Sequence, residues 1–289
     1  MRTTLLPDVE TRPRRVAVGE FDGVHLGHRE VIAGSDTVLT FEPHPRVIVS
    51  PDGAPPLLTT LEQKAGLIAD LGVDELVVIP FDAAFAARGA QDFLDSVLVG
   101  ALGAERVSVG ENFRFGNRAG GDAAMLAADD RFETRVVPLV EVEGEIVSSS
   151  RIRGLVLAGE VDHAAAFLGH PFELRGEVVH GDGRGRGLGY PTANVVPGDG
   201  MVCPGHGVYA CLAAGRPAAV NVGVRPTFET GRGVLVEAFL IDWEGDLYGQ
   251  ELSLEFLRRL RGERRFASAG ALVEQMARDV DDARAALAG

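Results

Sequence analysis

The hydrophobic pattern of this chain changes near residue 170, and the change divides the sequence into two folds. In the first part, short apolar runs alternate with longer stretches whose apolar residues recur at helical spacing. This rhythm is typical of a parallel α/β sheet with helical crossovers. We therefore predict an N-terminal α/β domain over residues 1–169, closed by a helical connector that begins at residue 150. The predicted strands are residues 16–18, 37–41, 76–79 and 107–109, and the predicted helices are residues 61–71 and 93–102.

The second part, over residues 170–289, has short alternating runs separated by glycine and proline turns. Such spacing predicts a small antiparallel β-barrel. The end of the chain differs, because one apolar stripe at helical spacing predicts a C-terminal helix that packs on the barrel. The stripe consists of Leu272, Met276, Val280, Ala283 and Leu287, and the predicted strands are residues 177–180, 208–212, 218–222, 235–241 and 251–256.

Composition narrows the classes of protein to which the chain can belong. Of its 289 residues, 46% are hydrophobic and 24% are charged, which is enough to bury a core in each domain. The formal net charge of -14 opposes binding to nucleic acid or to an anionic membrane surface. Its two cysteines, Cys203 and Cys211, can build neither a disulfide framework nor a four-ligand zinc site. Residues 1–15 lack the apolar core of a secretory signal, so we expect a cytoplasmic protein.

A glycine- and histidine-containing segment, residues 19–28, follows the first predicted strand. Its sequence is Gly-Glu-Phe-Asp-Gly-Val-His-Leu-Gly-His. Glycines in such a turn let a nucleotide phosphate approach the backbone N–H groups at the start of the next helix. His25 and His28 can then donate hydrogen bonds to charge that develops on a transferred phosphate. The alternative is that the two histidines are structural caps near a turn.

Further segments have the content and order found in a known enzyme family. Residues 19–28 and 147–153 together resemble the two signatures of the nucleotidylyltransferase superfamily. With residues 40–45 and 110–116, they resemble the prokaryotic bifunctional riboflavin kinase and FAD synthetase. The resemblance implies a Rossmann-like nucleotidylyltransferase fold for the N-terminal domain, with His25 and His28 as its catalytic pair. It also implies an ATP- and phosphate-binding set made of Gly19, Phe21, Asp22, Gly23, Gly27, Asn112, Ser149, Ser150 and Arg153.

A second glycine-rich segment, residues 181–190, leads directly into Pro-Thr-Ala-Asn at residues 191–194. It is neither a Walker A loop nor a dinucleotide-binding fingerprint. Glycines at alternate positions still let the backbone wrap a phosphate chain, whose charge Arg184 and Arg186 can offset. The alternative is a flexible surface loop. The glycines concerned are Gly181, Gly183, Gly185, Gly187 and Gly189.

This second segment, together with residues 221–228 and 246–249, resembles the riboflavin kinase signature of the same family. The resemblance implies that the Thr192 hydroxyl and the Asn194 amide oxygen ligate Mg²⁺, a hard cation that prefers oxygen donors. It also implies that Glu237 is the general base for the riboflavin 5′-hydroxyl, which must lose its proton as it attacks ATP. Without the resemblance, Glu237 is an outward-facing residue of an apolar strand.

Two departures from the family pattern concern the N-terminal domain. Eleven residues separate His28 from Thr40, so we expect the helix between them to lack its outer part. Glu20 places an anion where an uncharged residue is expected. Because a helix binds phosphate through its first turn, we predict that the remaining residues 27–32 still supply the anion site.

The leading hypothesis is a bifunctional enzyme that phosphorylates riboflavin to FMN and adenylylates FMN to FAD, with ATP as co-substrate and Mg²⁺ as metal. One alternative is a monofunctional riboflavin kinase with a decayed adenylyltransferase domain. Another is a relative of class I aminoacyl-tRNA synthetases, but the acidic chain lacks a Lys-Met-Ser-Lys-Ser-like loop. A third is a flavin-binding sensor, against which the pairing of Thr192, Asn194 and Glu237 argues. The expected partners are riboflavin, FMN and ATP, with no nucleic acid and no membrane.

Overall fold

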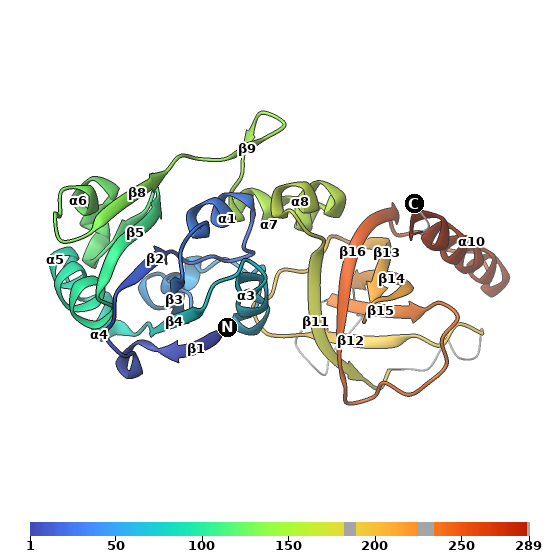
Figure 1. Ribbon diagram of the computed structural model, residues 1–289. Coiled ribbons are helices and arrows are strands. Elements are labelled where there is room, and N and C mark those ends of the chain that lie inside the picture. The colour runs from blue at the N-terminus through green and yellow to red at the C-terminus, as the bar shows by residue number, and fades with distance from the viewer. Residues whose placement is uncertain (182–188, 225–233, 288–289) are drawn as a thin grey trace. The chain divides into compact units, whose positions relative to one another are not determined.

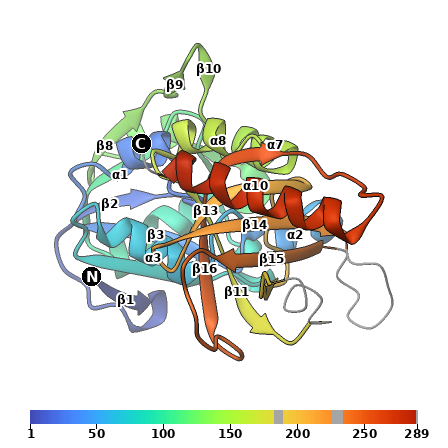
Figure 2. The same ribbon diagram turned by 90° about the vertical axis from the view of Figure 1, so that its right-hand side faces the viewer.

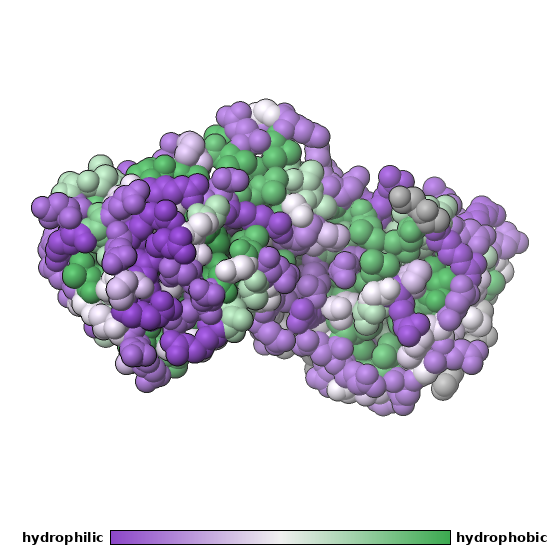
Figure 3. Space-filling view, in the orientation of Figure 1, coloured by the Kyte–Doolittle hydropathy of each residue, from purple (hydrophilic) through white to green (hydrophobic). Residues whose placement is uncertain are grey.

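The structure is a computed structural model that describes residues 1–181, 189–224 and 234–287. Its contacts divide the chain into two compact units, Met1–Ser149 and Ser150–Gly289, which are described separately (Figure 1). On the face drawn in Figure 3, each unit has hydrophilic residues with apolar patches among them. Within the described ranges, no helix is both long and apolar enough to cross a membrane.

The first unit is built on a six-stranded sheet in which all neighbouring strands are parallel. The four predicted strands are confirmed, and they occupy the middle of the sheet. Two further strands, β1 and β8, lie at its edges, where a strand needs no continuous apolar run and leaves a weaker sequence signal. In spatial order the strands are β1 (Arg2–Leu5), β4 (Glu75–Pro80), β3 (Thr37–Glu42), β2 (Arg14–Val18), β5 (Ala104–Gly110) and β8 (Glu133–Val137).

The strand order places a topological switch point beside β2. From β2 the chain builds outward through β3 and β4 on one side, and through β5 and β8 on the other. In open parallel sheets, the loops that leave the carboxyl ends of the strands at such a point diverge and form a ligand-binding crevice. Residues 19–25 leave β2 at this point, and the segment that contains Asn112 leaves β5.

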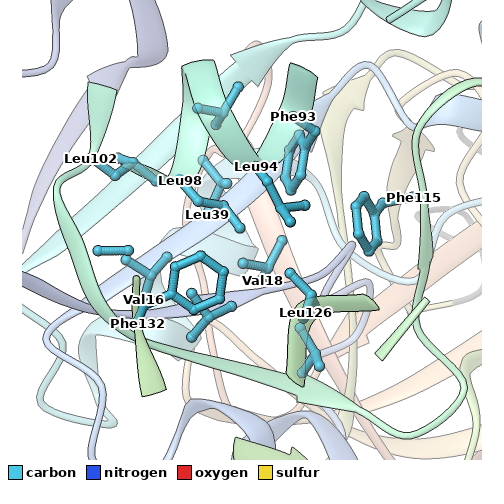
Figure 4. Close-up of a cluster of buried hydrophobic side chains, with 14 of the residues drawn as sticks. Val16, Val18, Leu39, Phe93, Leu94, Leu98, Leu102, Phe115, Leu126 and Phe132 are labelled. Atoms are coloured by element: carbon cyan, nitrogen blue, oxygen red, sulfur yellow. The ribbon is translucent and has the colours of Figure 1, made fainter. Parts of the chain in front are cut away.

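Helices cover both faces of this sheet, and each face has its own apolar core. Successive residues of β2 point to opposite faces, so Val16 and Val18 join one core while Ala17 joins the other. The first core, drawn in Figure 4, includes Phe93 and Leu126 from the covering helices. The second core packs residues of α1 and α3 on the opposite face. The predicted Rossmann-like α/β architecture is therefore confirmed.

Helices and short strands connect the six strands of the first unit. Helix α1 has seven residues and contains the segment of residues 27–32 that was predicted to supply the anion site; that role stays a prediction. The two predicted helices are α3, which starts with a capping box, and η3, which is a π-helix. The elements are η1 (Leu6–Asp8), α1 (Leu26–Ile32), α2 (Pro45–Val49), η2 (Pro51–Gly53), α3 (Leu61–Ala69), α4 (Ala83–Ala86), α5 (Ala90–Asp92), η3 (Phe93–Ala101), β6 (Arg114–Phe115), η4 (Asn117–Ala119), β7 (Gly121–Asp122), α6 (Ala123–Ala127), β9 (Glu141–Val142) and β10 (Glu145–Ile146).

The predicted connector consists of two helices, α7 (Ser149–Ala158) and α8 (Val161–Leu168), instead of one. Gly159 separates them with a φ of +79°, a left-handed conformation that favours glycine. A Cβ atom at Gly159 would also lie 2.5 Å from the hydroxyl of Tyr209 on the barrel. Contacts group α7, from Ser150 onward, and α8 with the second unit. The domain boundary at residue 170 stays a prediction.

The second unit contains a closed six-stranded antiparallel barrel, as predicted. Its strands in spatial order are β11 (Phe172–Val179), β12 (Ala193–Pro197), β15 (Val234–Leu240), β14 (Arg216–Val224), β13 (Gly207–Ala213) and β16 (Glu251–Arg261), and β16 pairs with β11 to close it. Strand β12 was not predicted, because only Val195 and Val196 stand between the preceding motif and Pro197. On β15, Val236, Ala238 and Leu240 are buried and alternate with outward-facing residues.

The predicted C-terminal helix is α10 (Ala269–Leu287), which packs across strands β13 and β14 (Figure 2). Val280 and Ala283 of its apolar stripe are buried against the barrel. A bidentate ion pair holds the helix in register, since the Arg261 guanidinium donates to both carboxylate oxygens of Asp279 at 2.8 and 2.7 Å. This helix therefore belongs to the fold of the second unit.

Candidate active sites

The loop after β2 has a strained backbone that side chains of a neighbouring segment hold in place. Phe21 and Val24 have φ values of +52° and +39°, which are uncommon for residues with a side chain. The backbone N–H groups of Leu58 and Thr59 each donate to the Asp22 carboxylate at 3.0 Å. Thr59 also accepts from the N–H of Gly23 at 3.1 Å. Asp22 therefore anchors the loop within this unit.

The two histidines of the loop lie against each other. The Nδ1 atom of His25 accepts a hydrogen bond from the backbone N–H of His28 at 3.2 Å, so His25 is the N-cap of α1. The imidazole rings stack with their centroids 3.5 Å apart, and Phe21 meets the His28 ring edge-on at 5.3 Å. Because Nδ1 of His25 is an acceptor, the proton of its neutral ring lies on Nε2. The capping hypothesis and the donor hypothesis are thus compatible.

Two glycines of this loop are needed for close packing. A Cβ atom at Gly19 would lie 3.0 Å from the ring of Phe21, and one at Gly27 would lie 3.3 Å from the ring of His25. These glycines let the aromatic ring and the imidazole lie directly against the backbone. The absence of a side chain at these two positions therefore has a packing reason that requires no phosphate contact.

The other residues of the N-terminal set lie after β5 and at the start of α7. Asn112 is exposed, two residues beyond the end of β5. Ser149 donates from its hydroxyl to the backbone oxygen of Asp22 at 3.0 Å, which joins it to the histidine loop. Ser150 and Arg153 lie on the first turn of α7 in the second unit, where Arg153 is buried.

Sequence analysis did not assign a role to Lys64, the only lysine of the chain. It is buried on α3, and its Nζ atom lies 3.5 Å from the hydroxyl of Thr40, which donates to the backbone oxygen of Glu20 at 3.0 Å. Burial raises the pKa of Glu20 to about 8; Lys64 lowers it, whereas Asp22 and Glu42 raise it further. The residue that departs from the family pattern is therefore a neutral acid at pH 7.

On the barrel, Glu237 lies in a row of polar residues that crosses three strands. Asn194 of β12 and Asn221 of β14 are its direct partners on either side, so the three side chains share the outer face of the barrel. The Asn221 amide donates to Glu237 at 3.4 Å. Asn221 was not proposed as a site residue; the signal for it was the same segment of residues 221–228 that carried the resemblance.

The glycine-rich segment starts directly over this polar row. A Cβ atom at Gly181 would lie 2.3 Å from the amide nitrogen of buried Asn194, so only glycine fits there. Gly189 has a φ of +85°, and Thr192 is half-buried just before β12. Five further predicted residues, Gly183, Arg184, Gly185, Arg186 and Gly187, lie outside the described residues.

The oxygen donors of Thr192 and Asn194 suit a magnesium ion. Mg²⁺ prefers oxygen ligands and is usually held by one or two protein groups together with substrate phosphates and water. Across the ranges that the structure covers, no cluster of three or more histidine, cysteine or acidic residues offers an alternative metal site. The close approach of Gly181 to Asn194 leaves room beside the amide that a larger residue would fill.

A cavity of about 270 Å³ lies between α10 and the barrel. Tyr190 and Phe239 line it with their rings, which meet edge to face at 5.2 Å. Phe239 faces outward two residues after Glu237 on β15, so the two side chains are about 7 Å apart along the strand. The rim of the cavity is charged, because Arg284 and Asp242 lie there and the Arg284 guanidinium donates to Asp242 at 2.6 Å. The cavity thus combines an apolar floor with a charged rim.

Comparisons with known proteins match each unit separately. A family model described as FAD synthetase matches residues 8–151, and one described as riboflavin kinase matches residues 168–287. Proteins named bifunctional riboflavin kinase/FMN adenylyltransferase are similar over 93% of this chain and 91% of their own length. The one from Listeria monocytogenes is 36% identical, and the one from Escherichia coli is 37% identical.

One solved structure has the same fold over nearly the whole chain. It is a crystal structure described as a macrolide-efflux protein from Streptococcus pneumoniae, with a TM-score of 0.88 and 31% sequence identity. The match covers 98% of this chain and 99% of that one.

Proposed function

Because the chain belongs to the family of bifunctional riboflavin kinases and FMN adenylyltransferases, we propose that it converts riboflavin to FMN and FMN to FAD, using ATP in both steps. The observation that carries the proposal is that two family models match the chain, FAD synthetase over residues 8–151 and riboflavin kinase over residues 168–287. Both halves of the family pattern are present, which favours two activities over a kinase alone.

For the kinase reaction, Glu237 is the proposed general base. The riboflavin 5′-oxygen attacks the γ-phosphorus of ATP, its proton passes to the Glu237 carboxylate, and ADP leaves. Asn221 orients this carboxylate through the hydrogen bond from its amide. Thr192 and Asn194 would hold Mg²⁺, which supplies charge neutralisation for the phosphate oxygens when bound. Gly181 and Gly189, with Gly183, Arg184, Gly185 and Gly187, form the proposed phosphate-binding loop.

The cavity beside α10 is the proposed site for the flavin ring. A planar, mostly apolar ring system gains most from an aromatic and apolar wall. Tyr190 and Phe239 provide that wall, and Glu237 lies on the same strand face about 7 Å from Phe239. A flavin whose ring lies against Phe239 can therefore extend its ribityl chain toward Glu237.

For adenylyl transfer, the FMN phosphate attacks the α-phosphorus of ATP and pyrophosphate leaves. His25 and His28 are proposed to donate hydrogen bonds to the charge that develops on the transferred phosphoryl group. Their stacking and the N-cap hydrogen bond fix the orientation of both rings. Asn112, Ser149, Ser150 and Arg153 are proposed to bind the phosphates of ATP. Asp22 is proposed to act indirectly, since its carboxylate holds the loop in place.

The two activities can be tested separately in the full-length protein. Riboflavin, ATP and Mg²⁺ are supplied in one series and FMN, ATP and Mg²⁺ in another, and the flavins are separated by chromatography. We expect Glu237→Gln to reduce FMN formation by about a hundredfold or more while supplied FMN still becomes FAD. His28→Ala should have the reverse pattern, with FAD formation reduced by about a hundredfold.

The matched control is Glu177→Gln, which makes the same chemical change at an exposed carboxylate on β11. It should alter neither rate. Kinase turnover that persists in Glu237→Gln would reassign the base. An unmutated protein that makes FMN but no FAD would support the monofunctional alternative and exclude adenylyl transfer.

A further inference from the structure

Glu20 lies in the loop after β2, next to the residues proposed to bind phosphate. The side chain is only partly accessible, and its Oε2 atom is shielded from solvent without a hydrogen-bond partner within the described part of the chain. A buried polar atom that lacks a hydrogen-bond partner destabilises a fold. Its presence in this loop calls for a partner that the described residues do not supply.

The charges around Glu20 favour its neutral form. The carboxylates of Asp22 and Glu42 both act on Glu20, and among the described residues Lys64 is the cation that acts on it. Asp22 is held as an acceptor by two backbone N–H groups, and Lys64 is directed at Thr40. A second buried anion would therefore lack a counter-charge, in agreement with the pKa of about 8 that burial gives Glu20.

We propose that Glu20, in its protonated form, is a substrate-binding residue that donates a hydrogen bond from Oε2 to an acceptor atom of the nucleotide bound at the loop after β2. The inference rests on the proposed adenylyltransferase function of the first unit. A protonated carboxyl is an uncharged donor, as an amide is. An ionised carboxylate would lose the donor and would repel the phosphates that the neighbouring loop is proposed to bind.

The proposal fixes the direction and the size of a pH effect. If only the protonated form binds substrate, the apparent KM rises as the protonated fraction falls. With a pKa of about 8, the KM should increase by roughly thirtyfold between pH 7 and pH 9.5. The kinase reaction of the second unit does not involve Glu20 and should not follow this curve.

The test measures KM and kcat for FAD formation between pH 6.5 and 9.5, with ATP varied in one series and FMN in the other. Glu20→Ala removes the donor and should raise one of the two KM values by about tenfold at pH 7. Glu20→Gln keeps an uncharged donor, so it should raise that KM less than Glu20→Ala and should remove the alkaline rise. The series in which this happens identifies the substrate that carries the acceptor.

Two controls accompany the variants. Glu105→Gln makes the same chemical change at an exposed residue of β5 and should leave the pH profile unaltered. FMN formation from riboflavin, measured in the same samples, reports whether the protein is intact. A KM in the unmutated protein that stays constant up to pH 9.5, or a Glu20→Gln variant as impaired as Glu20→Ala, would overturn the proposal.

Equilibrium dialysis separates this proposal from the proposed function. Labelled α,β-methylene ATP, which cannot undergo adenylyl transfer, is used in one series and FMN in the other. If Glu20 is a donor, the affinity of the unmutated protein for one of the two ligands should fall between pH 7 and pH 9.5. The Glu20→Gln variant should keep its affinity for that ligand over the same interval. This result would stand even if no FAD were formed, in which case only the proposed activity would fail. Equal affinities at both pH values in the two proteins would reject the role of Glu20.

Discussion

Replacement of Glu75 by glutamine should destabilise the first unit selectively. Glu75 is the first residue of β4, and its side chain is 2% exposed. Its carboxylate accepts hydrogen bonds from Thr4 at 2.8 Å and from Arg12 and Arg14 at 3.1 Å each, and it also accepts from Arg2. The Arg14 side chain is fully buried, so Glu75 is its counter-charge inside the protein. This cluster joins β1, the segment before β2 and β4.

The expected loss follows from the pKa of the carboxylate. Burial by itself would raise the pKa of Glu75, but hydrogen bonds from Arg2, Thr4 and Arg14 lower it from 4.5 to about 2. A shift of that size corresponds to about 3 kcal/mol of stability at neutral pH. Because the Arg2 side chain is 59% exposed, solvent screening reduces its share. We therefore expect Glu75→Gln to lower the free energy of unfolding of the first unit by about 2 kcal/mol.

Intrinsic chromophores allow the two units to be followed separately. The single tryptophan, Trp243, and all three tyrosines belong to the second unit. Urea unfolding followed by Trp243 fluorescence therefore reports the second unit, and far-UV circular dichroism reports both. Glu75→Gln should shift the unfolding transition of the first unit, which appears in circular dichroism, and should leave the transition followed by Trp243 fluorescence unchanged. Glu105→Gln, an exposed change on β5, is the matched control.

The pH dependence provides the refutation. A carboxylate with a lowered pKa stabilises the fold above pH 4.5, and this stabilisation is lost as the pH falls from 4.5 through about 2. The difference between Glu75→Gln and the unmutated protein should therefore shrink over that interval. A loss no larger than that of Glu105→Gln at pH 7, or a difference unchanged down to pH 2, would refute the reasoning.

Two other predictions concern the second unit. Gly181→Ala would place a Cβ atom 2.3 Å from the amide of Asn194. The KM for Mg-ATP in FMN formation should therefore rise by about tenfold, while FAD formation from FMN stays the same. An unaltered KM for Mg-ATP in the kinase reaction would contradict the proposal that this amide binds the metal. A fragment of residues 150–289 should be more stable in thermal unfolding than one of residues 170–289. The reason is that Arg259 and Gly205 donate to the backbone oxygens of Ala158 and Val156 in α7, and equal melting temperatures would support the boundary at residue 170.

Periodicity in the sequence was sufficient to determine the architecture of both units. The four central strands of the sheet are buried on both faces. Each is therefore a continuous apolar run, which can be recognised from the sequence alone. The barrel strands and the stripe of α10 have periods of two and of about 3.6 residues, which are set by local geometry. The edge strands β1 and β8 were missed, because a strand with one free edge can be formed by polar residues.

Motifs in the sequence predicted which residues to consider, but not how they contact one another. The segment of residues 19–28 indicated a phosphate site, whereas only the fold brings Asp22 to Leu58 and Thr59 and turns its carboxylate into an anchor. In the same way, the segment of residues 221–228 carried the resemblance but did not show what Asn221 contacts. Asn221 became a partner of Glu237 when β14 and β15 paired in one register, because antiparallel pairing alone decides which residues lie opposite each other.

Glu20 marks the boundary between the two kinds of information. The sequence determines that a carboxyl group stands in the loop, and from sequence alone that group is an anion. Only tertiary structure brings Glu42 and Lys64 to it and removes its Oε2 atom from water. The charge of an acid depends on the free energy of its ionised form in its surroundings, and those surroundings come from β3 and α3, which lie far away in the chain.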